Sequence, residues 1–305
     1  MKKLFYELPT ARRLDWFEAM KIITPNVSDK NNFALDKEGF YFSKGTVYGN
    51  ILKRDVADKI ELILGILNSK LLEFYFKHVS PMHAGGYFRY NTQYLEQLPI
   101  KLPQTEKEKV IASKIVGLTN QIVRSIKKLG MLKNRVDTFP NSYFKGDEKF
   151  EILVNIAGIN LSKKSYKISE KSLRTDRFTD IHDKETFRVI ITIGEYIDMF
   201  SKYEQLYVYE WLRTKIGEIV TRDELIRLNI PSERLKEILD ELESDKRRIE
   251  LIKKKINDFE IQIDNLVYEL YGVVGERDTI EQYLARFKKK IARNRLDRTF
   301  IKKIF

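Results

Sequence analysis

The chain has 305 residues, no cysteine, three histidines and a formal net charge of +12 at pH 7. The lack of cysteine excludes disulfides and thiolate metal sites, and three scattered histidines make a zinc site a poor expectation. No apolar run approaches the ~20 residues of a membrane span, and the first residues lack the apolar core of a secretory signal, so we expect a cytoplasmic protein with no membrane partner. The excess of Lys and Arg suits a polyanionic partner.

The first part of the chain reads as a leading segment followed by short strands. KIITP (21–25) and GFYFSKGTVYGNIL (39–52) are rich in β-branched and aromatic residues and are broken by turn residues. Polar side chains around these turns offer contacts to phosphates or bases: Asn31, Asn32, Lys44, Thr46 and Tyr48. The alternative is ordinary turn chemistry, because such residues also cap turns.

The stretch 62–100 combines a helix with an unusual polar and aromatic cluster. Apolar residues recur at helical spacing from Leu62 onward, and Pro81 predicts that the helix ends near Val79. Arg, Asn, Gln and aromatic groups can read base edges or stack on bases, and the glycines permit positive φ. The candidate DNA contacts here are His83, Gly85, Gly86, Tyr87, Arg89, Tyr90, Asn91 and Gln93. An aromatic-rich turn that packs on its own domain would show the same composition.

Two stretches carry apolar residues at alternating spacings of four and three. One runs from Ile111 to Val136, and the other from Ile238 to Leu270 with Asp245 as its single polar position. This spacing is typical of a coiled coil. We expect the two helices to form an antiparallel pair; the alternative is that one of them pairs with another chain.

A smaller α+β module lies between these helices, and a basic segment follows them. Strands are predicted within 149–168 and 186–200, with a polar connector between them and a helix over 203–217; a winged-helix reader is an alternative. Thr279 and Gln282 have capping-box spacing and predict the start of a basic amphipathic helix. A helix of this kind can contact phosphates, a partner groove or a membrane surface, and a solvated face would look the same.

These readings give an α+β chain with five parts. Residues 1–103 form a mixed α/β domain that carries the candidate DNA contacts, 104–139 a first long helix, 140–232 the small α+β module, 233–272 a second long helix that pairs with the first, and 273–305 the basic C-terminal helix.

The chemistry that the sequence lacks is also informative. There is no Pro-Pro pair of the kind that grips a flipped adenine, and no strand that ends in a Gly-x-Gly turn for S-adenosylmethionine. Neither a nuclease pattern for Mg²⁺ nor a phosphate-binding loop is present. We therefore predict no catalytic residue, no metal site and no cofactor on this chain.

The strings KIITPNVSDKNNFALDKEGFYFSKGTVYGNILK (21–53) and ILNSKLLEFYFKHVSPMHAGGYFRYNTQYLEQLPI (66–100) resemble a TaqI-like specificity domain. That is the target recognition domain at the C-terminal end of type IIG restriction-modification enzymes and adenine-N6 DNA methyltransferases, and it is similar to half of a type I specificity subunit. The likeness is close over residues 4–103, and IDNLVYELYGV (263–273) resembles the C-terminal helix of the same family.

The resemblance implies a sequence-specific DNA recognition subunit or domain, associated with the nucleoid. Its partners would be double-stranded DNA and an adenine-N6 methyltransferase or endonuclease, which would carry the S-adenosylmethionine, and Mg²⁺ in the case of a nuclease. The paired helices would be a spacer. Two alternatives remain open at this point: a divergent methyltransferase or nuclease with its own active site, and a coiled-coil or winged-helix DNA-binding regulator.

Overall fold

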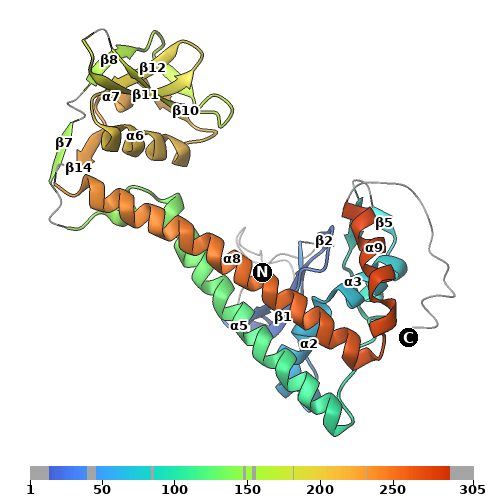
Figure 1. Ribbon diagram of the computed structural model, residues 1–305. Coiled ribbons are helices and arrows are strands. Elements are labelled where there is room, and N and C mark those ends of the chain that lie inside the picture. The colour runs from blue at the N-terminus through green and yellow to red at the C-terminus, as the bar shows by residue number, and fades with distance from the viewer. Residues whose placement is uncertain are drawn as a thin grey trace, which may run out of the picture. The chain divides into compact units, whose positions relative to one another are not determined.

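A computed structural model of the chain describes residues 14–39, 46–83, 86–146, 149–152, 156–180, 182–231 and 233–288 (Figure 1). The fold is α+β, and the chain divides into two compact units: residues 1–126 with 255–305 form the first unit, and residues 127–254 form the second. Two long helices, α5 (Glu106–Asp137) and α8 (Leu235–Tyr271), run through both. No helix of the described part is long and apolar enough to cross a membrane.

The first unit begins with helix α1 (Leu14–Glu18) and an antiparallel sheet in the order β3-β1-β4. Its strands are β1 (Lys21–Pro25), β3 (Ala34–Asp36) and β4 (Val47–Asn50), so the strand predicted at KIITP is confirmed. Lys21 Nζ lies 2.6 Å from the Asp36 carboxylate, and both side chains are buried. This pair links β1 to its neighbour β3, and Lys21 also donates to the Phe17 carbonyl.

The sequence predicted one continuous helix from Leu62 to Val79, and this is wrong: the stretch contains two helices with a break between them. After the 3₁₀ turn η1 (Arg54–Lys59), α2 (Ile60–Leu67) stops at Asn68, and α3 (Lys70–Val79) then runs to its expected end before Pro81. The Asn68 side chain donates to the Phe33 carbonyl at 2.9 Å and accepts from the Phe33 N–H at 3.0 Å. Asn68 thereby joins the helix break to the chain just before β3.

Helix α2 is buried on all sides, as expected of a helix that is apolar around its whole circumference. Leu62 and Ile66 belong to a core that also contains residues of α3, α5 and α8. Ile63 and Leu67 belong to a second core, on the side of β1 and the segment 88–90. The approach to α5 is close at Gly65, where a side chain would meet Thr119 and Ile115. Helix α2 therefore lies between the sheets and the long helices.

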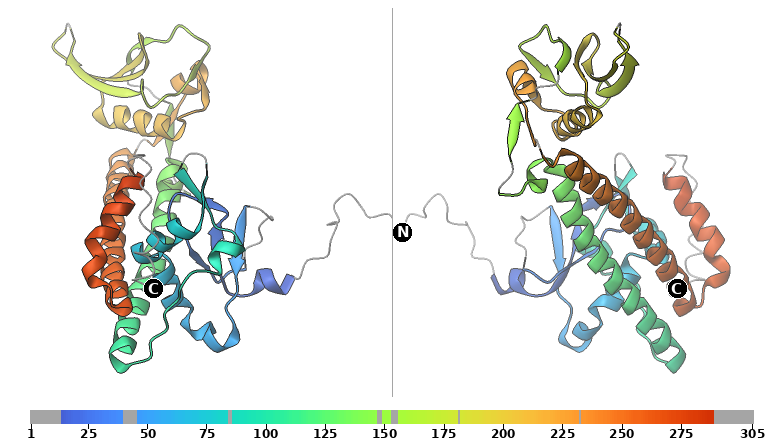
Figure 2. Two further views of the ribbon diagram at one scale, coloured as in Figure 1. Left: turned by 90° about the vertical axis from the view of Figure 1, so that its right-hand side faces the viewer. Right: turned by 60° about the vertical axis from the view of Figure 1, so that its left-hand side comes forward.

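Helices α5 and α8 lie side by side and antiparallel (Figures 1 and 2). Near the start of α5, Lys107 pairs with Glu269 of α8 at 3.3 Å; near its end, Arg135 pairs with Glu241 at 2.5 Å. The predicted seam positions are buried or half-buried on both helices. The polar position of the second seam, Asp245, is buried and accepts hydrogen bonds from Arg135 at 2.8 Å and from the Tyr143 hydroxyl at 3.0 Å.

Helix α8 also reaches the recognition half of the first unit through Asp264. Its carboxylate accepts the Lys70 backbone N–H at 2.8 Å, which satisfies a free donor at the start of α3. Burial raises the pKa of the Asp264 carboxyl to about 6, although the N–H and ammonium groups of Lys70 oppose this shift.

The chain continues from α8 through η4 (Val274–Glu276) into α9 (Arg277–Lys288). Thr279 lies inside this helix, so the predicted start at a Thr279–Gln282 capping box is wrong. Ile280, Tyr283 and Leu284 of α9 are buried in the core that contains α3. The remainder of the basic segment predicted over 273–305 lies outside the described residues from 289 onward.

The second unit contains a four-stranded antiparallel sheet in the order β10-β11-β12-β8. Its strands are β8 (Ile156–Asn160), β10 (Arg174–Thr179), β11 (Glu185–Thr192) and β12 (Glu195–Met199), and α6 (Lys202–Thr214) packs against three of them. Strand β10 lies in the stretch predicted as a polar connector. Two-stranded pairs join β7 (Phe150–Ile152) to β14 (Asn229–Pro231) and β9 (Ser165–Lys167) to β13 (Ile219–Thr221). Helix α7 (Arg222–Ile226) begins with a complete capping box.

The contact between α2 and α5 can be tested with two glycine substitutions. A Cβ at Gly65 would lie 2.5 Å from Thr119 Oγ1 and 2.8 Å from Ile115 Cγ2, whereas nothing lies within 4 Å of one at Gly117 on α5. We expect Gly65→Ala to lower the free energy of unfolding by about 1–3 kcal/mol through overpacking. Gly117→Ala, its matched control, should raise it by about 0.5–1 kcal/mol. Urea unfolding measures both, and stabilisation of both variants would show that α2 does not approach α5 this closely.

Asp264 predicts a specific pH dependence of stability. Its folded-state pKa is raised, so the folded protein binds this proton more tightly than the unfolded chain does, and stability is lost as pH rises from about 4 to about 6. Asp264→Asn keeps an acceptor for Lys70 but cannot ionise, so its stability relative to the wild type should increase over this interval, by about 3 kcal/mol at most. Denaturant unfolding at pH 4 and pH 7.5 measures the difference. Asp258→Asn, which removes an exposed carboxylate from the same helix, is the control and should retain the wild-type pH dependence.

Candidate nucleic-acid interface

A second small sheet of the first unit carries three of the predicted contact residues, His83, Tyr87 and Arg89. Strand β6 (Tyr87–Arg89) pairs antiparallel with β2 (Val27–Ser28) on one side and with β5 (Met82–His83) on the other. Alternate residues of β6 point to opposite faces. Phe88 is buried, whereas Tyr87 and Arg89 are exposed, and Val27 lies opposite Arg89 in the register. The sheet therefore turns one aromatic and one guanidinium group toward solvent.

The inner side of this sheet is fixed by Tyr90. Its ring stacks on Phe76 with centroids 4.1 Å apart, and its hydroxyl donates to Asn31 Oδ1 at 2.9 Å. Asn31 in turn donates to the Leu67 carbonyl at the end of α2, at 2.6 Å. Burial, reinforced by the carboxylates of Glu73 and Asp29, raises the pKa of the Tyr90 hydroxyl well above its usual range.

Tyr90 and Asn31 therefore correct part of the predicted contact set. Tyr90 has no exposed surface and Asn31 has 7%, and the hydrogen bonds of both side chains are directed into the protein. Side chains so placed hold the loop 26–33 against the sheet and do not reach a ligand at the surface. Tyr90 and Asn31 have side chains of the kind that contacts DNA, but both are buried. They fit the alternative interpretation, in which an aromatic-rich turn packs on its own domain.

The loop that Asn31 anchors presents its neighbour to solvent. Asn32 is exposed between Asn31 and Phe33, which are both buried, and Lys30 is exposed on the other side. The described residues make no hydrogen bond or ion pair to the side chains of Asn32 and Arg89. Because the backbone on both sides of Asn32 is fixed, its amide is free to bind a ligand at little further cost in conformational entropy.

The other predicted contact residues differ in how far their side chains are exposed to solvent. Thr46 is exposed, and its carbonyl accepts the Asn26 N–H at 2.9 Å, which brings the start of β4 next to β2; Tyr48 is half-buried opposite Thr24. Gln93 is exposed on α4 (Thr92–Leu95). Asn91 precedes α4, and its Oδ1 is shielded from solvent without a hydrogen bond from the described residues.

Glycine at position 86 is required by the backbone, because its φ is +85°. The sequence predicted positive φ in the Gly85-Gly86 pair, and this is confirmed for Gly86. Lys44 and Gly85 lie outside the described residues, and of His83 only the backbone pairing with Tyr87 is described.

Sequence reasoning missed a buried ion pair beneath β6. Lys77 and Glu73, one turn apart on α3, lie 2.6 Å from each other, and the Lys77 ammonium lies 5.6 Å from the centre of the Phe88 ring. The i,i+4 spacing of the two residues was visible in the sequence, but the same spacing is common on solvated helix faces. Their burial under an aromatic strand depends on tertiary packing.

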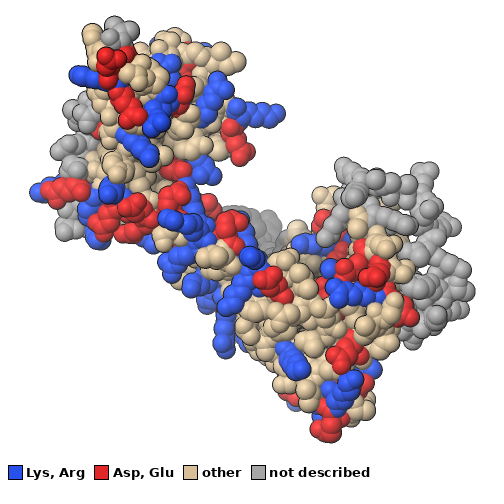
Figure 3. All heavy atoms as spheres, in the orientation of Figure 1, with Lys and Arg blue, Asp and Glu red and all other residues tan. Residues whose placement is uncertain are grey.

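The basic residues do not form one continuous surface on the face drawn in Figure 3, where Lys and Arg alternate with Asp and Glu over much of the described surface. The many ion pairs between neighbouring side chains agree with this, for example Lys37 with Glu61 at 3.1 Å. Net charge alone therefore does not locate the interface, and the exposed groups of the β2-β6-β5 sheet are the more specific feature.

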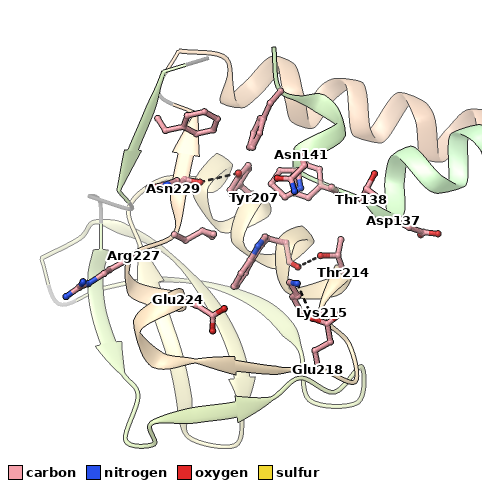
Figure 4. A pocket seen from close by; sticks show the side chains of 16 residues that line it. Asp137, Thr138, Asn141, Tyr207, Thr214, Lys215, Glu218, Glu224, Arg227 and Asn229 are labelled. Atoms are coloured by element: carbon pink, nitrogen blue, oxygen red, sulfur yellow. Dashed lines mark hydrogen bonds and ion pairs between the residues drawn. The ribbon is translucent and has the colours of Figure 1, made fainter. Parts of the chain in front are cut away.

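The second unit contains a pocket of about 620 Å³. Its carboxylates come from Asp137, Glu218 and Glu224, and Figure 4 shows that they do not converge. Glu218 pairs with Lys215 at 3.0 Å, and hydrogen bonds from the backbone and hydroxyl of Thr221 lower the pKa of Glu224. The carboxylates of this pocket therefore do not form the converging pair that is typical of many acid–base active sites. No group of three His, Asp or Glu side chains that could hold a metal ion occurs among the described residues.

Comparison with protein families identifies the part of the chain that carries this sheet. Residues 5–100 match the family model of the TaqI-like C-terminal specificity domain. The matched range contains β1 to β6 together with α2 and α3, and ends before α5. This confirms the resemblance drawn from the sequence and indicates that the matched residues serve DNA sequence recognition of the restriction-modification type, a role that is generally non-catalytic and that implies a methyltransferase-type partner.

The anchoring role of Tyr90 can be separated from ligand contact by a pair of hydroxyl deletions. Tyr90→Phe keeps the stack on Phe76 but leaves the buried Asn31 oxygen without its donor, so we expect unfolding to become easier by about 1–3 kcal/mol. Tyr87→Phe, on the exposed face of the same sheet, should change stability by less than about 0.5 kcal/mol. Thermal and urea unfolding distinguish the two. Equal effects would contradict the assignment of Tyr90 to the core and Tyr87 to the surface.

Proposed function

We propose that this chain is the sequence-specific DNA recognition part of a restriction-modification system, acting with an adenine-N6 methyltransferase or an endonuclease as a separate subunit or as a further domain. The observation that carries the proposal is the coincidence of the family match over residues 5–100 with a small sheet that presents Tyr87 and Arg89 to solvent. The same sheet is anchored from below by Tyr90.

In the proposed mechanism the contacts divide into positioning and reading. Exposed lysines such as Lys30 bind phosphates and set the register of the protein on the duplex. Arg89 reads a base edge in the major groove, where a guanidinium can pair with the O6 and N7 of guanine, and the amide of Asn32 is suited to adenine. The anchored loop and strand keep these groups in place before DNA arrives, which reduces the entropy lost on binding.

The chain itself makes and breaks no bond in this proposal. The partner binds S-adenosylmethionine and methylates a flipped adenine, or cleaves the duplex with Mg²⁺ if it is a nuclease. The antiparallel helices act as a spacer between the recognition domain and the rest of the assembly. The basic segment at the C-terminus adds contacts to phosphates. A protein with this role resides in the cytoplasm, on the nucleoid.

Arg89 gives the sharpest test of base reading. Selection from a random-sequence duplex pool defines the preferred site of the full chain, and fluorescence anisotropy then gives Kd on that site and on a shuffled duplex. Arg89→Ala should lose about 1–3 kcal/mol on the preferred site and little on the shuffled one. Arg54→Ala, which removes an exposed arginine on η1 outside the proposed contacts, is the matched control and should leave the preference unchanged.

Two results would contradict the proposal. An equal loss on both duplexes would make Arg89 a phosphate contact with no role in reading, and no enrichment of any sequence in the selection would remove the recognition function. Transfer of a labelled methyl group to DNA by the chain alone would show that it is the enzyme and not only its recognition part.

A further inference from the structure

The tip of the β11–β12 hairpin in the second unit carries an isoleucine that is not buried in the core of that unit. Ile193 is 93% exposed, more than any other large hydrophobic residue described. It is followed by Gly194, whose φ of +75° suits glycine in this tight turn. Asn160 Nδ2 donates to the Gly194 carbonyl at 2.7 Å, so the tip is held in place from the neighbouring strand β8.

A single acidic residue at the base of this tip is satisfied internally. Glu195 is buried and accepts hydrogen bonds from the Ser162 backbone and hydroxyl and, at 3.0 Å, from the Tyr166 hydroxyl. These bonds, chiefly those from Ser162, lower the pKa of Glu195. Its negative charge is therefore directed into the fold and fixes the segment 162–166 beside the hairpin.

That segment brings exposed cations to the tip. Lys163 and Lys164 follow Ser162 directly, and the Arg222 N–H donates to the Lys164 carbonyl at 2.9 Å, which places the first residue of α7 beside them. On the other side of the hairpin, Ser172 donates to the Ile191 carbonyl at 2.8 Å and holds the loop that carries Lys171. Arg174 is paired with Ile190 in the register, at the same end of the sheet.

These cations differ from many others of the second unit. Arg188 pairs with Asp198 at 2.7 Å, Arg177 with Glu185 at 3.1 Å and Lys246 with Glu210 at 2.7 Å. Within the described residues no such ion pair is made by the set at the hairpin end, which consists of Lys163, Lys164, Lys171, Arg174 and Arg222. Lys163 also lies in the field of the buried Glu195 carboxylate, which offsets part of the positive charge there. Exposed cations without an ion pair around an exposed apolar side chain nevertheless fit a polyanion that also offers an apolar surface.

We propose that this end of the second unit is a second DNA-binding site, in which Lys163, Lys164 and Arg222 contact phosphates and Ile193 enters the minor groove as a wedge between base pairs. An isoleucine can partly unstack a base step and kink the duplex, and flanking cations compensate the phosphates on either side. The inference rests on the proposed function to the extent that the chain binds DNA. It adds a site outside the range matched by the specificity-domain family, and this site would read DNA deformability and not base edges.

Two variants of the full chain test the phosphate contacts and the wedge separately. The triple variant Lys163→Gln, Lys164→Gln, Arg222→Gln should lower the slope of log Kd against log salt concentration by about two to three, since each phosphate contact contributes about 0.9. Ile193→Ser should keep that slope but abolish DNA bending, which is about 20° or more for a wedge of this type. The probe is a mixed-sequence 40-base-pair duplex that carries the selected site, with fluorophores at its ends for energy transfer.

The control is Lys202→Gln, an exposed lysine at the start of α6, next to the opposite end of β12. It should change neither the slope nor the bend. A triple variant with the wild-type slope, in a chain that still prefers its selected site, would overturn this second site and leave the proposed function standing. Absence of any DNA binding by the wild-type chain would overturn both. If the triple variant bound DNA as the wild type does but no longer bound the methyltransferase or nuclease partner, the surface would be a protein-binding site. That result would also contradict the proposal.

Discussion

Burial of helix α2 on all sides is the constraint on which the first unit depends. A helix with Leu, Ile and Gly around its whole circumference must be covered on every side, and here one side is covered by the sheets and the other by α5 and α8. Gly65 allows the approach to Thr119, and Asp264 caps α3 from the opposite long helix. Helix α2 therefore connects the core beneath the recognition sheet with the core of the helical pair in the first unit.

The same constraint explains how polar groups can be presented with a fixed geometry. Residues of α2 and α3 provide the surface on which Tyr90 stacks and the carbonyl that Asn31 binds, and these two contacts orient the loop and strand above them. Side chains that read DNA need such support, since a displacement of about an ångström is enough to lose a hydrogen bond. In this unit the buried members of the polar and aromatic cluster supply the support, and the exposed ones, Tyr87 and Arg89, are left for the ligand.

Patterns with strong local periodicity were predictable from the sequence, and features decided by tertiary contact were not. The long helices followed from the spacing of Ile111 and its successors, and β1 followed from KIITP. Strand β10 was missed because its residues are almost all exposed and half of them are charged, so no alternation of apolar and polar residues marks it. The break at Asn68 was missed because it depends on Phe33, far away in the chain. Composition identified the cluster at 87–93 as a candidate site but gave no way to separate Tyr90, which faces the core, from Tyr87, which faces solvent.

The distribution of ion pairs gives a criterion that net charge does not. A formal charge of +12 is spread over many lysines and arginines, and a large share of those described are compensated by a neighbouring carboxylate, as in Arg135 with Asp245 and Glu241. A cation beside a carboxylate attracts a phosphate less strongly, because the carboxylate repels the phosphate and offsets the positive charge. The described cations that make no ion pair include Arg89 on the recognition sheet and those at the hairpin of the second unit, and these are the ones that the two proposals assign to DNA. On this argument the affinity of the chain for DNA depends on a small subset of its basic residues, and that subset is divided between two structural units whose contributions to the salt dependence can be measured one at a time.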